Sequence, residues 1–144
     1  MRKIVLWAVV ALMAVAIAAV PALAANPHTN PQTQPLFCDT NNAGTVVTCG
    51  GELAGLGNVA FIDVVVDIDA GCATKRSAHE PPGHFQVLDE DIPVTKSGRA
   101  TFSTEVAPDC PPGLNEAFGS TAFITVFEAN TTNVLFTSGP ITVT

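Results

Sequence analysis

Aromatic residues other than phenylalanine are almost missing from this chain of 144 residues. It has no tyrosine, and its one tryptophan, Trp7, lies in the apolar leader at the N-terminus. Ligand sites are lined mainly by apolar and aromatic side chains around a cleft. The scarcity of these residues therefore disfavours a glycoside hydrolase and a carbohydrate-binding module. The eight phenylalanines are expected mostly at inward-facing positions.

Basic residues are also scarce. The chain has six lysines and arginines against thirteen aspartates and glutamates, and two of the six, Arg2 and Lys3, belong to the leader. The remaining chain has one adjacent basic pair, Lys75 and Arg76. Proteins bind the phosphates of nucleic acids through clusters of lysine and arginine, so nucleic acid is excluded as a partner. The acidic balance also repels anionic lipid and favours solubility.

The signatures of common catalytic sites are absent. The chain has no Gly-x-Ser-x-Gly elbow, no phosphate-binding loop and no dinucleotide fingerprint. Three histidines, one of them close to the leader, leave few ways to assemble a serine–histidine–acid triad. We expect no enzymatic activity and no cofactor.

The N-terminus has the pattern of a secretory signal peptide. Two basic residues precede the apolar run 4–20, and Pro21 is followed by Ala22-Leu23-Ala24, small residues two apart at a cleavage site. An uncleaved membrane anchor is the competing interpretation, since the run approaches the length of a membrane span. We predict a signal-peptide helix over 1–24, cleavage after Ala24, and a secreted protein that has no membrane contact once cleaved.

The leader is followed by a polar segment. Residues 26–35, NPHTNPQTQP, contain three prolines and no large apolar residue. Such a segment cannot contribute to a core. We predict a flexible lead-in over 25–35 and a single folded domain over 36–144.

Four cysteines, Cys38, Cys49, Cys72 and Cys110, lie in the exported part. An even number in an oxidising compartment indicates disulfides and leaves no free catalytic thiol. Three pairings are possible. We favour Cys38 with Cys49, which bracket a short turn-rich segment, and Cys72 with Cys110, which lie in loops just outside two predicted strands.

The rest of the chain alternates with the period of two that is typical of strands. In residues 59–68, one face carries Ile62, Val64, Val66 and Ile68, and the other carries aspartates. The other predicted strands are 45–49, 85–88, 99–106, 122–128, 134–137 and 141–143. Glycine and proline turns separate them, and the intervals are too short for helices. We predict an all-β, antiparallel, two-sheet β-sandwich of about seven strands, immunoglobulin-like, with a small barrel as the alternative.

Residues 79–84, HEPPGH, resemble a zinc-protease signature with one residue too many. The histidines are five apart, and Pro81-Pro82-Gly83 cannot lie within a helix, so the helical zinc motif is excluded. A loop could still bring His79, Glu80 and His84 together around a metal, with further ligands from Asp89, Glu90 or Asp91. The alternative is a solvated loop, and no ligand spacing here is diagnostic of a metal.

Two other clusters have simple structural interpretations. Asp63, Asp67 and Asp69 lie too far apart on an extended strand to share one ion without other ligands, so a solvated sheet face explains them. Phe123 and Phe127 share a face at strand spacing, and we expect them in the core rather than in a ligand pocket.

Several short stretches together resemble small exported β-sandwich proteins common in Gram-positive, especially actinobacterial, genomes. They are VTCGGELAGLGN at 47–58, Cys72, Pro82-Gly83, KSGRATF at 96–102, Cys110-Pro111 and LFTSGPITVT at 135–144. The resemblance implies export and fold, and brings no catalytic residue. The charged stretch 74–84 departs from the usual small polar loop of such proteins.

The sequence therefore predicts a secreted, disulfide-stabilised, non-enzymatic β-sandwich that binds a protein or cell-envelope partner. One alternative is a carrier of a small ligand, by analogy with actinobacterial chromoprotein sandwiches. The other is a metal-dependent hydrolase that uses the loop of His79 and His84.

Overall fold

The computed structural model describes residues 26–30, 32–74 and 83–144. The predicted signal helix and its cleavage site lie outside these residues. The described chain is all-β, with strands separated by turns. The strands are β1 (His28–Thr29), β2 (Phe37–Thr40), β3 (Val47–Ala54), β4 (Phe61–Ala73), β5 (His84–Pro93), β6 (Ala100–Val106), β7 (Asn115–Glu128), β8 (Val134–Thr137) and β9 (Ile141–Thr142).

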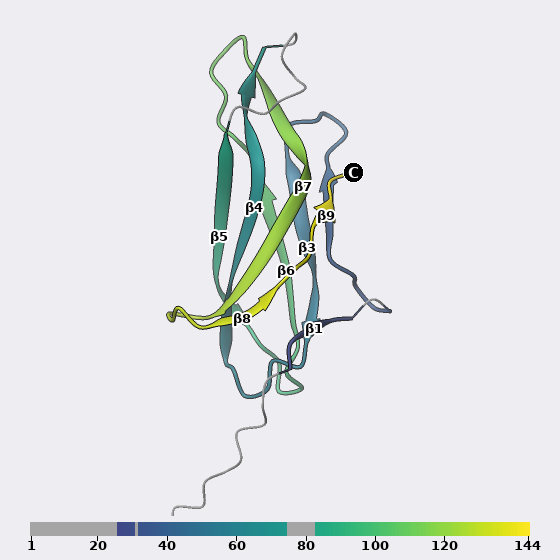
Figure 1. The fold of residues 1–144 in the computed structure, drawn as a ribbon, viewed down its shortest axis with the longest axis vertical. Coiled ribbons are helices and arrows are strands. Elements are labelled where there is room, and N and C mark those ends of the chain that lie inside the picture. The colour runs from purple at the N-terminus through teal and green to yellow at the C-terminus, as the bar shows by residue number, and fades with distance from the viewer. Residues whose placement is uncertain (1–25, 31, 75–82) are drawn as a thin grey trace, which may run out of the picture.

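The strands form two antiparallel sheets. In the first, β3 is central, with β6 on one edge and β1 and β2 on the other. In the second, the order is β5-β4-β7, and both β8 and β9 lie along the outer edge of β7. The long strands β4, β5 and β7 run side by side (Figure 1). In the described chain the sheets do not close into a barrel, so the predicted β-sandwich is confirmed.

The seven predicted strands correspond to β3 through β9, and β1 and β2 are two strands that were not predicted. Strands β8 and β9 share one edge of β7 and act as a single interrupted strand. The predicted alternation of β4 is also confirmed, because Ile62, Val64 and Val66 are fully buried between the sheets. Complete burial of each such side chain contributes about 1.5–3 kcal/mol. The side chains of Phe102 and Val106 on β6 fill the same core.

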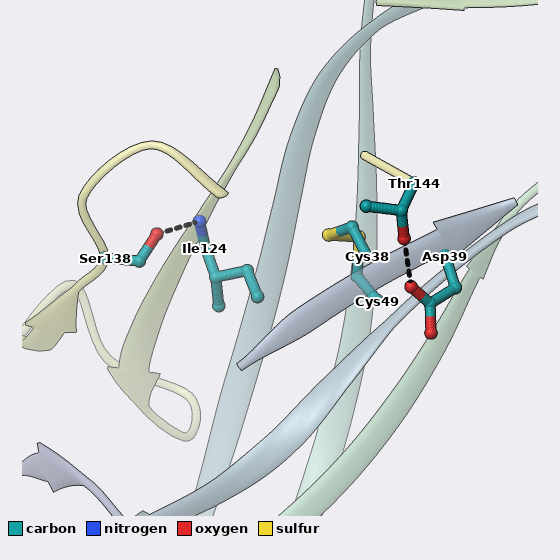
Figure 2. Close-up of a disulfide and its surroundings, with 6 residues drawn as sticks. All are labelled: Cys38, Asp39, Cys49, Ile124, Ser138 and Thr144. Atoms are coloured by element: carbon teal, nitrogen blue, oxygen red, sulfur yellow. Dashed lines mark hydrogen bonds between the residues drawn. A yellow bond between two sulfur atoms is a disulfide. The ribbon is translucent and has the colours of Figure 1, made fainter. Parts of the chain in front are cut away.

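Both favoured disulfides are present. Cys38 and Cys49 lie opposite each other on β2 and β3 and are buried in the core (Figure 2). Cys72, near the end of β4, is bonded to Cys110, which follows β6. The second bond therefore ties β4 to the connection that leads from β6 of the first sheet to β7 of the second, whereas the first lies within one sheet.

The last residues also connect the two sheets. Ile141 pairs with Ala122 of β7, whereas Val143 forms a parallel bridge with Cys38 of β2. The Thr144 amide donates to the Cys38 carbonyl, and the Thr144 hydroxyl donates to the Asp39 carboxylate at 2.6 Å (Figure 2). Strand β9 and the residues after it thus close one side of the sandwich.

Ser138 fills the break between β8 and β9. Its hydroxyl accepts from the amide of the buried Ile124 at 2.8 Å, and its own amide donates to the Ile124 carbonyl (Figure 2). The side chain therefore replaces a backbone acceptor that the interrupted edge strand lacks at this point.

Ser138→Ala is expected to lower the free energy of unfolding by about 1–2 kcal/mol, because it leaves the buried Ile124 amide without its acceptor. The measurement is urea unfolding followed by far-ultraviolet circular dichroism. Ser103→Ala, at an exposed position of β6, is the control and should change the value by less than about 0.5 kcal/mol. Equal effects of the two substitutions would contradict this role for Ser138.

The segment 25–35 was predicted as a flexible lead-in, but its described residues are paired with the folded domain. The Asn26 amide donates to the Gly55 carbonyl at 2.9 Å, β1 pairs with the end of β3, and the Glu52 amide donates to the Gln34 carbonyl. Gly55 has φ of 74°, and a Cβ there would collide with the Asn26 carbonyl, so this approach requires glycine. The domain therefore begins by Asn26 rather than near Leu36.

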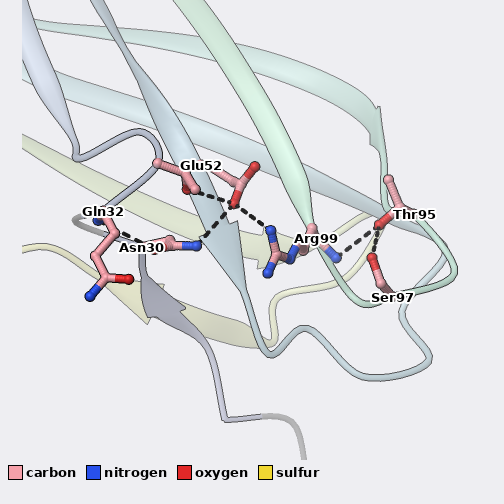
Figure 3. A network of polar contacts seen from close by, with 7 residues as sticks. Asn30, Gln32, Glu52, Thr95, Ser97 and Arg99 are labelled. Carbon is pink, nitrogen blue, oxygen red and sulfur yellow. Dashed lines mark hydrogen bonds and ion pairs between the residues drawn. The ribbon is translucent and has the colours of Figure 1, made fainter.

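Polar side chains add to this docking. The Glu52 carboxylate on β3 accepts from Thr33 at 3.2 Å, lies 3.5 Å from the Asn30 amide nitrogen and pairs with Arg99 at 3.4 Å (Figure 3). The segment is held by backbone pairing and by one shared acceptor. Neither the backbone pairing nor the shared acceptor leaves a pattern of apolar residues in the sequence. The start of the domain was therefore predicted too late in the chain.

Candidate functional site

The predicted histidine loop is only partly within the described chain. His79 and Glu80 lie outside the described residues. His84 begins β5, and its Nε2 lies 3.1 Å from Asp67 Oδ2, while its Nδ1 lies 3.6 Å from Asp69 Oδ1. Gln86 donates to the same Asp67 oxygen at 2.8 Å. In the part of the chain that the structure describes, no group of three or more His, Cys, Asp or Glu side chains is arranged to hold a metal ion.

Asp89, one of the additional ligands considered, points away from this loop. It faces the sandwich interior, where the buried Thr104 hydroxyl donates to its Oδ2 at 3.2 Å. Two residues later, Asp91 has φ of 56° beside a register shift between β4 and β5. An inward charge and an irregularity both hinder pairing of an edge strand with a foreign strand. The edge of β5 is therefore protected from pairing with a foreign strand. The outer face of the second sheet is the surface that a partner can reach.

The outer face of the second sheet carries a continuous apolar area. Val65 of β4 lies opposite Leu88 of β5 and Thr125 of β7, with Phe123 and Phe127 two residues away from Thr125 on the same face. Phe127 in turn lies opposite Val134 of β8. Cross-strand and diagonal neighbours at these positions are within side-chain contact range. We call this area the outer patch: Phe61, Val65, Leu88, Phe123, Phe127 and Val134.

The outer patch is well exposed. Phe61 is 48% exposed, Leu88 53%, Phe123 44% and Val134 51%. A large apolar side chain presents about 200 Å² when free, so these four present on the order of 400 Å² together. Contiguous apolar areas of this size on soluble monomers are often functional.

Phe123 and Phe127 are therefore not core residues, and that prediction was wrong. Ala122, Ile124 and Val126 are fully buried and occupy the inner face of β7. Successive side chains of a strand point to opposite faces, so the phenylalanines face outward. Residues 122–127 carry apolar side chains on both faces, and the sequence alone does not say which face the core takes.

Asp63 lies within the outer patch and fixes the backbone on both sides. Its Oδ1 accepts from the Asp91 amide at 2.9 Å and its Oδ2 from the Asn130 amide at 3.1 Å. Both donors belong to residues with positive φ, 56° for Asp91 and 60° for Asn130. One carboxylate thus holds the irregular part of β5 and the turn after β7. The backbone that borders the outer patch near Asp63 is therefore held in place without a partner.

A hollow of about 300 Å³ lies elsewhere, beside the start of the described chain. Asn26 and His28, the turn 55–58 and the turn 96–98 line it. Its volume is at the lower limit for small-ligand sites, but none of its lining residues carries a large aliphatic side chain or a phenylalanine ring of the kind such sites use. The hollow therefore supports a carrier of a small ligand less than the outer patch supports a protein-binding module.

No family model, no curated protein and no solved structure matches this chain. Its described residues define a disulfide-bonded, antiparallel β-sandwich with an exposed apolar sheet face. The two disulfides indicate an oxidising environment such as the cell exterior. The described residues include no helix that is long and apolar enough to cross a membrane.

Proposed function

We propose that this chain is a secreted, non-enzymatic β-sandwich module that binds another protein through the outer patch. The observation that carries the proposal is the half-exposed apolar surface of Phe61, Leu88, Phe123 and Val134 on a regular sheet. Such a surface is costly to leave in water and supplies binding energy when a partner covers it.

Export is supported by two independent features. The N-terminal leader has the pattern of a signal peptide, and the disulfides are of the kind that persist outside the cytosol. We therefore expect the partner protein to lie at the cell envelope or outside the cell.

A structural role for the acidic groups supports a binding module over an enzyme. The Asp63 carboxylate accepts two backbone amides, Asp89 accepts from the buried Thr104, and Glu52 holds the N-terminal segment. These carboxylates fix the fold. The outer patch is an exposed apolar face of a sheet, and such a surface suits docking to another protein.

Photo-crosslinking from the outer patch tests this function. A photoreactive amino acid in place of Leu88 is expected to form an adduct with a protein in the secreting culture. The same amino acid in place of Ser103, exposed on the other sheet, should form none. Excess unlabelled protein should compete with the adduct, whereas excess Phe123→Ser protein should not, because the partner no longer gains the apolar contact.

Two outcomes would contradict the proposal. One is equal adduct formation from both positions, which would mean that the outer patch has no special affinity. The other is turnover of a peptide, lipid or glycoside by the purified protein that a single substitution abolishes.

A further inference from the structure

The middle of the outer patch, where Val65 lies opposite Leu88, is flanked by negative charge. Asp67 and Asp69 project from β4 on one side of it, beside His84 and level with Phe123. Glu90 and Asp91 are exposed on β5 on the other side, next to Asp63 and level with Phe127. Residues rise about 3.3 Å each along a strand, so the two acidic clusters are roughly 13–20 Å apart, with apolar side chains between them.

Among the described residues, no lysine or arginine side chain pairs with these carboxylates. In residues 26–30, 32–74 and 83–144, the ion pair that involves a lysine or arginine side chain joins Arg99 to Glu52, on the other sheet. The whole chain has a formal charge of −7. Val65 and Leu88 in the middle of the outer patch therefore lie between two acidic clusters, which we call the acidic rims: Asp67 and Asp69 on one side, Glu90 and Asp91 on the other.

We propose that the partner of the outer patch is a cationic protein surface, with apolar side chains that cover Val65, Leu88 and Phe123 and with lysine or arginine side chains that reach both acidic rims. This inference rests on the proposed function and names the partner's chemistry. The apolar contact supplies most of the affinity, whereas the complementary charges raise the association rate and select the partner.

A second copy of the chain fits this surface poorly. Two outer patches face to face would bring like-charged rims together, and like charges opposed across an interface cost several kcal/mol. The proposed complex is therefore between different proteins. Sedimentation should show a monomer at micromolar concentration, and a dimer that Phe123→Ser disperses would overturn the inference.

The binding test uses a defined probe. A labelled peptide of about 14 residues, with leucines on one face of a helix and lysines at both ends, spans about 20 Å. Fluorescence anisotropy with the secreted protein should show binding at 20 mM salt that weakens about 10-fold at 300 mM salt, because salt screens exposed charges. A matched peptide with glutamate in place of lysine should bind at least 10-fold more weakly.

Charge-matched variants locate the effect. Asp67→Asn with Glu90→Gln removes one charge from each rim and should weaken peptide binding about 10-fold while reducing its salt dependence. Glu105→Gln with Asp109→Asn removes two exposed charges from and beyond β6 and should weaken it less than 2-fold. Phe123→Ser should weaken binding about 10-fold and leave the salt dependence unchanged.

The outcomes separate the partner's chemistry from the proposed function. Equal effects of the two charge-matched pairs, or equal binding of the glutamate peptide, would overturn the cationic partner. If the crosslinked protein then binds the rim variant as tightly as the wild type, the outer patch keeps its function with a partner of other chemistry. If Phe123→Ser alters neither crosslinking nor peptide binding, the function itself fails.

Discussion

Replacing both Cys72 and Cys110 with alanine is expected to lower the free energy of unfolding by about 4 kcal/mol. The two cysteines are 38 residues apart in sequence, so their bond removes a long loop from the unfolded ensemble. The entropy cost of closing a loop grows with the logarithm of loop length. The Cys72–Cys110 bond should therefore stabilise the fold by about 1 kcal/mol more than the Cys38–Cys49 bond, whose cysteines are 11 residues apart. A loss of this size is a large fraction of the stability of a single domain.

The position of the bond strengthens this expectation. Cys72 belongs to β4 of the second sheet, and Cys110 lies in the connection from β6 to β7, so the disulfide ties the crossover between the two sheets to β4. Guanidinium unfolding followed by far-ultraviolet circular dichroism measures the change, since residues 25–144 include no tryptophan or tyrosine for fluorescence.

The replacement residue provides the control. Both cysteines are only partly buried, so Cys72→Ser with Cys110→Ser should give the same loss as the alanine pair within about 0.5 kcal/mol. A loss below about 1 kcal/mol in both variants would contradict this expectation and would mean that residual structure already holds the two positions near each other in the unfolded chain.

The sandwich was predictable wherever the alternation of side chains is unambiguous. In residues 62–69 of β4 every inward position is Ile or Val and three of the four outward positions are Asp, so only one assignment of faces buries the apolar set. The pairing of the cysteines was predictable for a similar reason, since each pair brackets a turn or lies beside predicted strands. The N-terminal segment was not, because it docks through backbone hydrogen bonds that leave no apolar pattern.

The outer patch was much harder to predict. It is assembled from β4, β5, β7 and β8, and its continuity depends on the register that sets Val65 opposite Leu88 and Phe127 opposite Val134. Register across strands is decided by tertiary pairing, which one sequence does not reveal. The one available signal was the run 122–127, in which small and branched residues alternate with phenylalanines. The size of the phenylalanines favours their face as the core, whereas Ala122, Ile124 and Val126 occupy it.

The second large effect is expected at Asp63. Asp63→Ala should lower the free energy of unfolding by about 2–3 kcal/mol, because two backbone amides lose a charged acceptor at once. Each such bond is worth about 1.5–3 kcal/mol when shielded, and the lower part of that range applies because both bonds reach solvent. The affected residues, Asp91 and Asn130, have positive φ, a conformation that non-glycine residues adopt only when held by their surroundings.

Asp69→Ala is the matched control for Asp63, since it removes an aspartate from the same face of the same strand. The Asp69 carboxylate contacts only the His84 ring, at 3.6 Å, among the described hydrogen bonds and ion pairs, and its removal should cost less than about 0.5 kcal/mol. Amide hydrogen exchange identifies the cause: Asp63→Ala should speed exchange at Asp91 and Asn130 before it affects the core of β4. If exchange at these two amides is unchanged while stability falls, the loss comes from elsewhere. If both change together, one carboxylate fixes β5 and the turn after β7, and the shape of the outer patch depends on it.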